Sequence, residues 1–247
     1  MIVAGLPLWV WPGVALVAAL YGSVGHGGAS GYIALLVLAG LAAERVAFPA
    51  LALNLIVAGL AAWNFHRAGH SRWKLLWPLA AASVPAAFFG GVWYLPPHIY
   101  RIILGVTLLA GAARFLFLQK AVAARPLPAH FTTMAPFIGA VLGLVSGLVG
   151  VGGGIFLSPL LMLLGWADAR ETAWASAVFI WVNSVAGLTA RQLSGQADWA
   201  LVPPLAAAVL LGGAVGSWLG AHRLPRIVLQ RLNGAVLLLA SVKLLWV

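Results

Sequence analysis

Long apolar runs alternate with short polar, proline-containing or glycine-containing breaks along the whole of this 247-residue chain. A helix that crosses a bilayer needs about 20 consecutive apolar residues, within a range of roughly 17–25. The pattern therefore predicts an all-α polytopic membrane protein whose ten helical segments are 7–24, 29–42, 46–65, 75–94, 98–118, 134–149, 153–166, 172–190, 199–220 and 228–246. Segments 29–42 and 153–166 are too short to cross comfortably, and 134–149 is marginal.

Each of the two shortest segments follows a glycine-rich stretch inside an apolar run. The first break is Gly25-His26-Gly27-Gly28, and the second break, 125 residues later, is Gly150-Val151-Gly152-Gly153-Gly154. At membrane depth, non-helical backbone is tolerated only where it is buried in protein or lines a cavity. Interrupted segments at corresponding positions of two halves are therefore the sequence feature that best indicates a transport site.

Other landmarks recur at nearly the same spacing. The matched positions are Tyr21-Gly22 with Ser146-Gly147, Gly40 with Gly165, and, at an offset of 126, Trp73 with Trp199. We therefore expect two five-segment halves, a first membrane repeat over 1–118 and a second over 134–247. Residues 119–133 would form a cytoplasmic linker.

Loop charges predict that the two halves have opposite orientations. The loop 66–74 is basic, whereas its counterpart 191–199 holds Arg191 against Asp198, and basic residues gather again in 221–231. Cytoplasmic loops of membrane proteins are enriched in Lys and Arg. We therefore place 66–74, 221–231 and the linker in the cytoplasm and the N-terminus outside, which makes the halves an inverted repeat. The hairpins at the breaks would enter from opposite faces, and their length leaves open whether they are re-entrant or fully spanning.

Composition agrees with a membrane protein and argues against other classes. The chain is 63% hydrophobic and 7% charged, whereas soluble domains average about 25% charged residues. A net charge of +10 would suggest nucleic acid in a soluble protein, but here the bilayer explains the basic loops, so we predict no nucleic-acid partner. With no cysteine, no His/carboxylate cluster and no carboxylate pair, the sequence predicts no metal, no cofactor and no enzyme activity.

The breaks suit an anion. The first turn of a helix has backbone N–H groups without intrahelical partners, and the helix dipole adds about half a positive charge there. No Asp or Glu is predicted in the membrane interior to coordinate a cation. We therefore expect a small anionic substrate where two such helix starts meet. The candidate substrate-binding residues are Ser23, Gly25, His26, Gly27, Gly28, Asn54, Ser146, Gly150, Gly152, Gly153, Gly154 and Asn183.

Several of these residues also have a structural interpretation. His26, the candidate for a coupling proton, could instead be neutral and donate to a nearby carbonyl. Asn54 and Asn183 could bridge helices or contact the substrate. We assign two further glycine pairs to close helix packing, namely Gly143 with Gly147 and Gly212 with Gly216.

The stretches 21–28 and 143–159 resemble the sulfite exporter TauE/SafE family, also called the toluene-sulfonate uptake permease family. The second stretch is close to the family pattern, whereas the first has Ala29 in place of Gly154 and no proline matching Pro159. The resemblance covers essentially the whole chain. It implies a multi-pass secondary transporter of the bacterial or archaeal cytoplasmic (inner) membrane, for sulfite, sulfonates, sulfoacetate or related compounds.

We therefore expect a carrier that moves a small anion, most simply an oxidised sulfur compound, by alternating access with proton coupling. The alternatives are an anion-selective channel and a carrier of an organic carboxylate. The sequence is also compatible with a homo-oligomer. His26 and Val151 occupy matching positions, so proton chemistry would be confined to one half. We also expect Gly27→Leu or Gly152→Leu to abolish anion binding while the protein still folds.

Overall fold

The computed structural model describes residues 2–3, 5–93, 95–117 and 126–223, with residues 238, 241–242 and 245–246 near the C-terminus. Within these residues the chain is almost entirely helical, as predicted. The helices are α1 (Val10–Ser23), α2 (Ala29–Leu38), α3 (Ala43–Arg67), α4 (Trp73–Val92), α5 (Pro97–Phe117), α6 (Phe131–Val149), α7 (Gly154–Leu163), α8 (Ala169–Leu193) and α9 (Val202–His222). The predicted segment 228–246 lies almost wholly outside the described residues.

The N-terminus begins with a pair of short strands. β1 (Ile2–Val3) pairs antiparallel with β2 (Leu6–Pro7) around Gly5. The prediction that the first helix begins at residue 7 was therefore wrong, because Pro7 belongs to β2 and α1 begins only at Val10.

The two helices that follow the breaks are short and equal in length. Each has ten residues, or about 15 Å, which is half of the roughly 30 Å apolar core of a bilayer. Their predicted ends at residues 42 and 166 were too late. Gly40 (φ +97°) and Gly165 (φ +66°) adopt the left-handed conformation and end the helices at Leu38 and Leu163.

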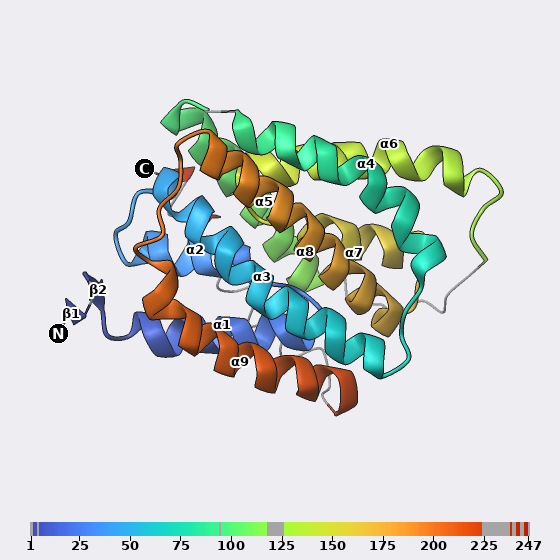
Figure 1. The fold of residues 1–247 in the computed structure, drawn as a ribbon, viewed down its shortest axis with the longest axis horizontal. Coiled ribbons are helices and arrows are strands. Elements are labelled where there is room, and N and C mark those ends of the chain that lie inside the picture. The colour runs from blue at the N-terminus through green and yellow to red at the C-terminus, as the bar shows by residue number, and fades with distance from the viewer. Residues whose placement is uncertain are drawn as a thin grey trace.

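Long helices pack in three pairs, α1 with α9, α3 with α8, and α4 with α6 (Figure 1). The outer pairs flank the central one, since α9 also packs on α3 and α4 on α8. The central helices are antiparallel, because Asn54 contacts Ser184 while the later residue Gly59 faces the earlier Trp181. Each short helix packs on the central helix of its own half, α2 on α3 and α7 on α8.

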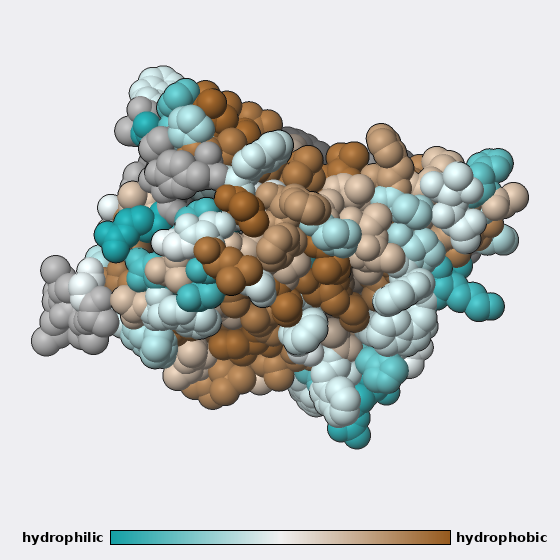
Figure 2. Space-filling view, turned by 45° about the horizontal axis from the view of Figure 1, so that its top comes forward, coloured by the Kyte–Doolittle hydropathy of each residue, from teal (hydrophilic) through white to brown (hydrophobic). Residues whose placement is uncertain are grey.

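The outer surface suits a lipid environment. Five described helices are long and apolar enough to cross a membrane, namely α3 from Arg45 onward, α4, α6, α8 and α9. In the face shown in Figure 2, hydrophobic residues cover the middle and hydrophilic ones gather mostly toward the two ends. Large apolar side chains such as Trp77, Phe89, Phe137 and Leu211 are exposed. An exposed apolar surface of this extent is typical of a membrane-facing protein.

Glycine stripes hold the two outer pairs in close contact. A side-chain carbon added at any of these glycines would overlap a backbone carbonyl oxygen of the facing helix. The α6 stripe, Gly139, Gly143 and Gly147, faces Leu79, Ser83 and Ala87 of α4, and the α9 stripe, Gly212, Gly216 and Gly220, faces Ala15, Ala19 and Ser23 of α1. The assignment of the Gly143/Gly147 and Gly212/Gly216 pairs to helix packing is thereby confirmed.

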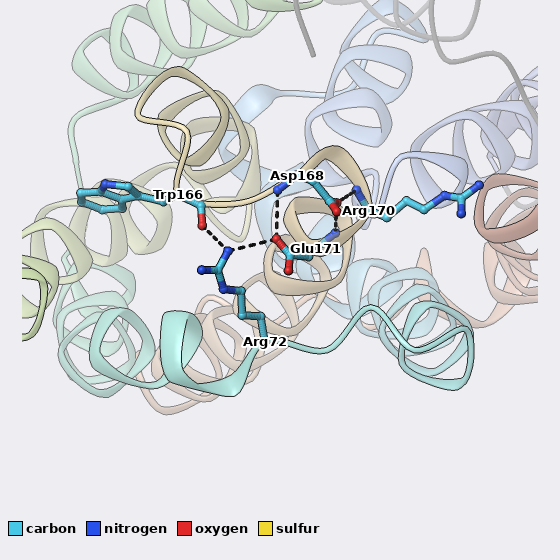
Figure 3. Close-up of polar contacts among 5 residues, drawn as sticks. All are labelled: Arg72, Trp166, Asp168, Arg170 and Glu171. Atoms are coloured by element: carbon cyan, nitrogen blue, oxygen red, sulfur yellow. Dashed lines mark hydrogen bonds and ion pairs between the residues drawn. The ribbon is translucent and has the colours of Figure 1, made fainter. Parts of the chain in front are cut away.

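Two ion pairs hold opposite ends of the central helices. Arg72, just before α4, donates to Glu171 in the first turn of α8 at 3.0 Å and to the Trp166 carbonyl at 2.6 Å (Figure 3). At the other end, Arg45 in the first turn of α3 pairs with Asp198 at 3.2 Å. The Arg45 side chain is 71% exposed, whereas those of Arg72 and Glu171 are only 24% and 25% exposed.

Gly216→Ala should destabilise the protein by about 1–3 kcal/mol, because the new methyl group overlaps the Ala19 carbonyl and the helices must separate. Thermal denaturation of purified protein in detergent measures this. Gly59→Ala is the matched control. Its added carbon would meet Trp181 only at an ordinary 3.4 Å, so loss of a helical glycine should stabilise by roughly 0.5–1 kcal/mol. Equal melting temperatures for the two variants would contradict the packing role.

Candidate functional site

The two breaks meet at the middle of the central helix pair. A side-chain carbon added at Gly27 would overlap the Asn54 side chain, and one added at Gly152 would lie 2.6 Å from Asn54 Nδ2 and 2.9 Å from Ile180. Asn54 and Ile180 are each the twelfth of the 25 residues of their helices, α3 and α8. The structure therefore brings the two glycine breaks together at mid-length of α3 and α8, the two longest described helices.

Packing at the outer edges of the breaks follows the same repeat. Gly25 lies against the backbone of Ala173 in α8, and Gly150 lies against Ala47 in α3. Ala47 and Ala173 are themselves 126 residues apart. The first break therefore packs against α8, and the second break packs against α3.

Polar groups of the first break are paired within the protein. His26 N–H donates to the Tyr21 carbonyl at 2.8 Å, closing the end of α1. Gly28 (φ +99°) is the N-cap of α2, and Asn54 Oδ1 accepts the N–H of Ala29, the first residue of the helix, at 3.0 Å. The Tyr32 hydroxyl donates to the Gly27 carbonyl at 3.1 Å. The positive end of α2 is therefore already occupied by a side-chain acceptor.

Asn54 also joins the two halves. Its Nδ2 donates to Ser184 Oγ on α8 at 3.0 Å, and its side chain is fully buried. Of the two roles that the sequence allowed, this arrangement matches the helix bridge. The residue at the repeat-equivalent position of α8 is Ile180, which has no polar group.

His26 reaches from the first break into the second half. Its ring is 3% exposed, with Nδ1 3.2 Å from the Val24 carbonyl and Nε2 3.1 Å from Ser158 Oγ on α7. Ser158 Oγ lies 2.7 Å from Ser176 Oγ on α8. A carbonyl only accepts, so neutral His26 carries its proton on Nδ1 and accepts from Ser158, whereas protonated His26 donates to both partners. Ser158 and Ser176 can reorient between these states.

Ser176 was not among the residues singled out from the sequence. It stands among small and apolar residues inside a predicted helix, and hydropathy gives such a serine no distinction. Only the packing of α7 on α8 places it beside Ser158.

The second break resembles the first in backbone, except that Gly152 is left-handed whereas its counterpart Gly27 is not, and its side chains differ. Gly150, Gly152 and Gly153 have φ of +80°, +75° and +81°, and Gly153 is the N-cap of α7 as Gly28 is of α2. Gly154, the first residue of α7, packs against Ile180. Ser146 Oγ is buried and has no hydrogen-bond partner among the described residues.

Two predicted residues lie away from the meeting point. Ser23 Oγ donates to the Leu20 carbonyl of its own helix at 2.7 Å. Asn183 turns toward α4, where its Oδ1 accepts from Ser83 Oγ at 2.6 Å, and its Nδ2 has no partner among the described residues. The structure therefore gathers the glycines, His26, Asn54 and Ser146 around the breaks and leaves Ser23 and Asn183 to one side.

Arg191 is a buried cation that the sequence pattern assigned to a loop. The predicted end of the segment at residue 190 was too early, because α8 continues to Leu193. Arg191 is 4% exposed and donates to the carbonyls of Gly147 and Leu148, at 3.1 and 3.0 Å, at the end of α6. A charge beside a polar stretch looks like a loop residue in the sequence, so only tertiary contact identifies it as buried.

A separate cavity of about 400 Å³ lies between α3, α4 and α8, away from the breaks. Its lining is mostly aromatic and comprises Gly59, Ala62, Trp63, His66, Trp73, Trp174, Val178 and Trp181. Among the described residues, no group of three His, Asp or Glu side chains is placed to hold a metal ion.

Comparison with known proteins places the chain in a transporter family. Residues 10–244 match the family described as Sulfite exporter TauE/SafE. The chain is 35% identical over 234 residues to the probable membrane transporter protein y4hK of Sinorhizobium fredii, covering 94% of this chain and 95% of that protein. It is also 30% identical over 80 residues to the probable membrane transporter protein YunE of Bacillus subtilis, covering 32% and 29% of the two chains. No solved structure matches the chain significantly. The chain thus belongs to the sulfite exporter TauE/SafE family of multi-pass membrane transporters.

Proposed function

We propose that this protein is a secondary carrier of a small anion, bound where the two glycine breaks meet. The observation that carries the proposal is the convergence of both breaks on Asn54 and Ile180, halfway along the central helices. Interrupted helices at repeat-related positions are the usual place of a transport site. Helix starts at this depth favour negative charge.

The placement of acidic residues supports an anion. Asp168 caps the start of α8, Glu171 pairs with Arg72, and Asp198 pairs with Arg45. None of these three carboxylates contacts a break. An oxidised sulfur compound is the substrate class that the family description favours.

An inverted repeat is supported by the exchange of packing partners between the halves. By the repeat spacing, α1 corresponds to α6 and α4 to α9. The pairs α1–α9 and α4–α6 are therefore equivalent, and so are the contacts of α9 with α3 and of α4 with α8. A carrier of this construction can expose its site to one side at a time by moving one part against the other.

The two end ion pairs are equivalent with their charges exchanged. Arg72 corresponds to Asp198, and Arg45 to Glu171, at an offset of 126. Arg72–Glu171 and Arg45–Asp198 thus close opposite ends of the central pair in the same way. In alternating access, each pair would stabilise closure of its own end, with Arg72–Glu171 on the cytoplasmic side by the loop charges.

His26 supplies a route for a coupling proton. Its Nε2, Ser158 Oγ and Ser176 Oγ form a continuous chain between the first break and α8. Protonation of the ring would reverse the donor at each step of this chain and add a positive charge beside the anion site. Coupling would then be confined to the first break, because Val151 stands at the matching position of the second.

Reconstituted vesicles preloaded with unlabelled sulfite should take up labelled sulfite faster than empty ones, because a carrier returns faster when loaded. Tracer counterflow measures this difference. Unitary currents without trans-acceleration would identify an anion channel instead. The absence of uptake for sulfite, thiosulfate, sulfoacetate and simple carboxylates would overturn the proposal.

Arg72→Glu should slow sulfite exchange by about two- to fivefold, since partly exposed ion pairs contribute roughly 0.2–1 kcal/mol. Adding Glu171→Arg should restore the rate, because it re-forms an ion pair with the charges exchanged. The equivalent pair at the other end, Arg45–Asp198, already has its charges in that arrangement. Arg67→Glu makes the same charge change near the same loop, where Arg67 lies over the Trp63 ring and forms no ion pair with a described carboxylate, and should have no comparable effect. A double variant as slow as Arg72→Glu would contradict the role of the pair.

His26→Gln should abolish accumulation driven by an imposed pH gradient and leave counterflow without a gradient intact. His130→Gln, which alters an exposed histidine before α6, is the control and should behave as the unmodified protein. Gradient-driven accumulation that survives in His26→Gln would rule out His26 as the coupling group.

The leucine substitutions suggested by the sequence are poor tests of binding. A side chain at Gly27 overlaps Asn54, and one at Gly152 meets both Asn54 and Ile180. We therefore expect both variants to destabilise the fold, because the glycines are packed against buried side chains.

A further inference from the structure

Unpartnered polar atoms gather in the second half of the chain. Among the described residues, the buried side-chain atoms without a hydrogen-bond partner are Ser146 Oγ, Thr172 Oγ1, Asn183 Nδ2 and Arg191 Nε. All four belong to α6 or α8. A buried polar atom without a partner is costly, so several in one region call for an explanation.

Ser146 borders the second break, and Arg191 contacts the end of α6 just before it. Gly153, the start of α7, is flanked by Ser146 and Phe179, since an added side-chain carbon there would lie 3.2 Å from Ser146 Cβ and 2.9 Å from Phe179. Asn183 is one helical turn beyond Phe179 on α8. Arg191 is two turns further and reaches the carbonyls of the two residues that follow Ser146. Thr172, the fourth, lies at the far end of α8.

Ser146, Asn183 and Arg191 share one chemical property, which is that each can donate. Asn Nδ2 and Arg Nε only donate, and the Ser hydroxyl donates readily to an anion. Arg191 makes no ion pair with any described carboxylate. Arg191 Nη2 donates to the carbonyls at the end of α6, and Nη1 donates to Gln196 Oε1 at 2.9 Å. Neither contact involves Nε. A buried guanidinium without a counter-ion is matched best by an anion.

The described residues of the first half offer no comparable set of unpartnered polar atoms. Asn54 fills the start of α2, whereas Ile180 stands at the equivalent place beside α7. Tyr21, which corresponds to Ser146, has its hydroxyl 3.1 Å from Ser30 Oγ. The polar side chains beside the first break are thus paired within the protein, whereas Ser146 Oγ beside the second has no partner among the described residues.

We infer that the second half alone supplies the side chains that hold the anion. Ser146 and the start of α7 bind it at the break, and Arg191, which contacts the end of α6 just before the break, counters its charge. The ligand class is a small oxyanion with several acceptor oxygens, and the inference rests on the proposed function. It makes the anion site and the proton site belong to different breaks.

Ser146→Ala separates binding from stability. It removes an atom that has no hydrogen-bond partner among the described residues, so the melting temperature without ligand should stay the same or rise. The sulfite-dependent rise in melting temperature should shrink, with affinity about tenfold weaker or more, since a donor to a charged group is lost. Thr172→Val is the matched control, because it removes an equally buried, unpartnered hydroxyl at the other end of α8 and should leave the sulfite effect unchanged.

Arg191→Lys and Arg191→Gln test whether the positive charge of Arg191 contributes to anion binding. Lysine should retain part of the sulfite-dependent shift and glutamine should lose it; if neither variant folds, the Ser146→Ala comparison decides. A sulfite effect that is equal in Ser146→Ala and Thr172→Val, whether kept or lost in both, would overturn the inference. If unmodified protein shows no shift with sulfite, thiosulfate or sulfoacetate, the proposed function itself fails.

Discussion

The structure depends on one constraint: backbone polar groups inside an apolar environment must find partners within the protein. Two interruptions of helix at mid-length of the bundle are therefore tolerable only where other helices supply those partners. Asn54 does so for the first N–H of α2, and Arg191 does so for the last carbonyls of α6. The close pairs α1–α9 and α4–α6, made possible by glycine stripes, leave the central helices free to surround the breaks.

The two breaks are followed by short helices of equal length and share most of their left-handed glycines, but their side chains differ. Lengths of the short and central helices, their left-handed glycines and the positions of their contacts repeat closely. Side chains at matching positions do not, as Asn54 against Ile180 and Tyr21 against Ser146 illustrate. A symmetric frame can therefore hold unlike groups, one titratable and others purely donating, at nearly the same depth. For a coupled carrier, this would keep the proton and the anion close without making them compete for the same atoms.

Most of the fold could be predicted because its signals are local. Apolar runs long enough to cross a bilayer, and glycines that interrupt them, placed the nine described helices to within a few residues. The errors occurred at helix ends, because a single capping residue determines where a helix begins or stops. Gly40 and Gly165 end α2 and α7 early, and the cap at Asp168 lets α8 begin before the predicted start at residue 172. The family resemblance likewise followed from local motifs and is confirmed by the match over residues 10–244.

The sequence by itself determined the membrane class and the two glycine breaks, because hydropathy and glycine content act on neighbouring residues. Only the tertiary structure decided which polar groups are satisfied. It paired Asn54 with Ser184, joined His26 to Ser158 and Ser176, and buried Arg191 against α6. These contacts join residues far apart in the chain, and in an apolar interior the free energy of a polar group depends on such partners. The breaks are therefore visible in the sequence, whereas their unequal chemistry is visible only in the fold.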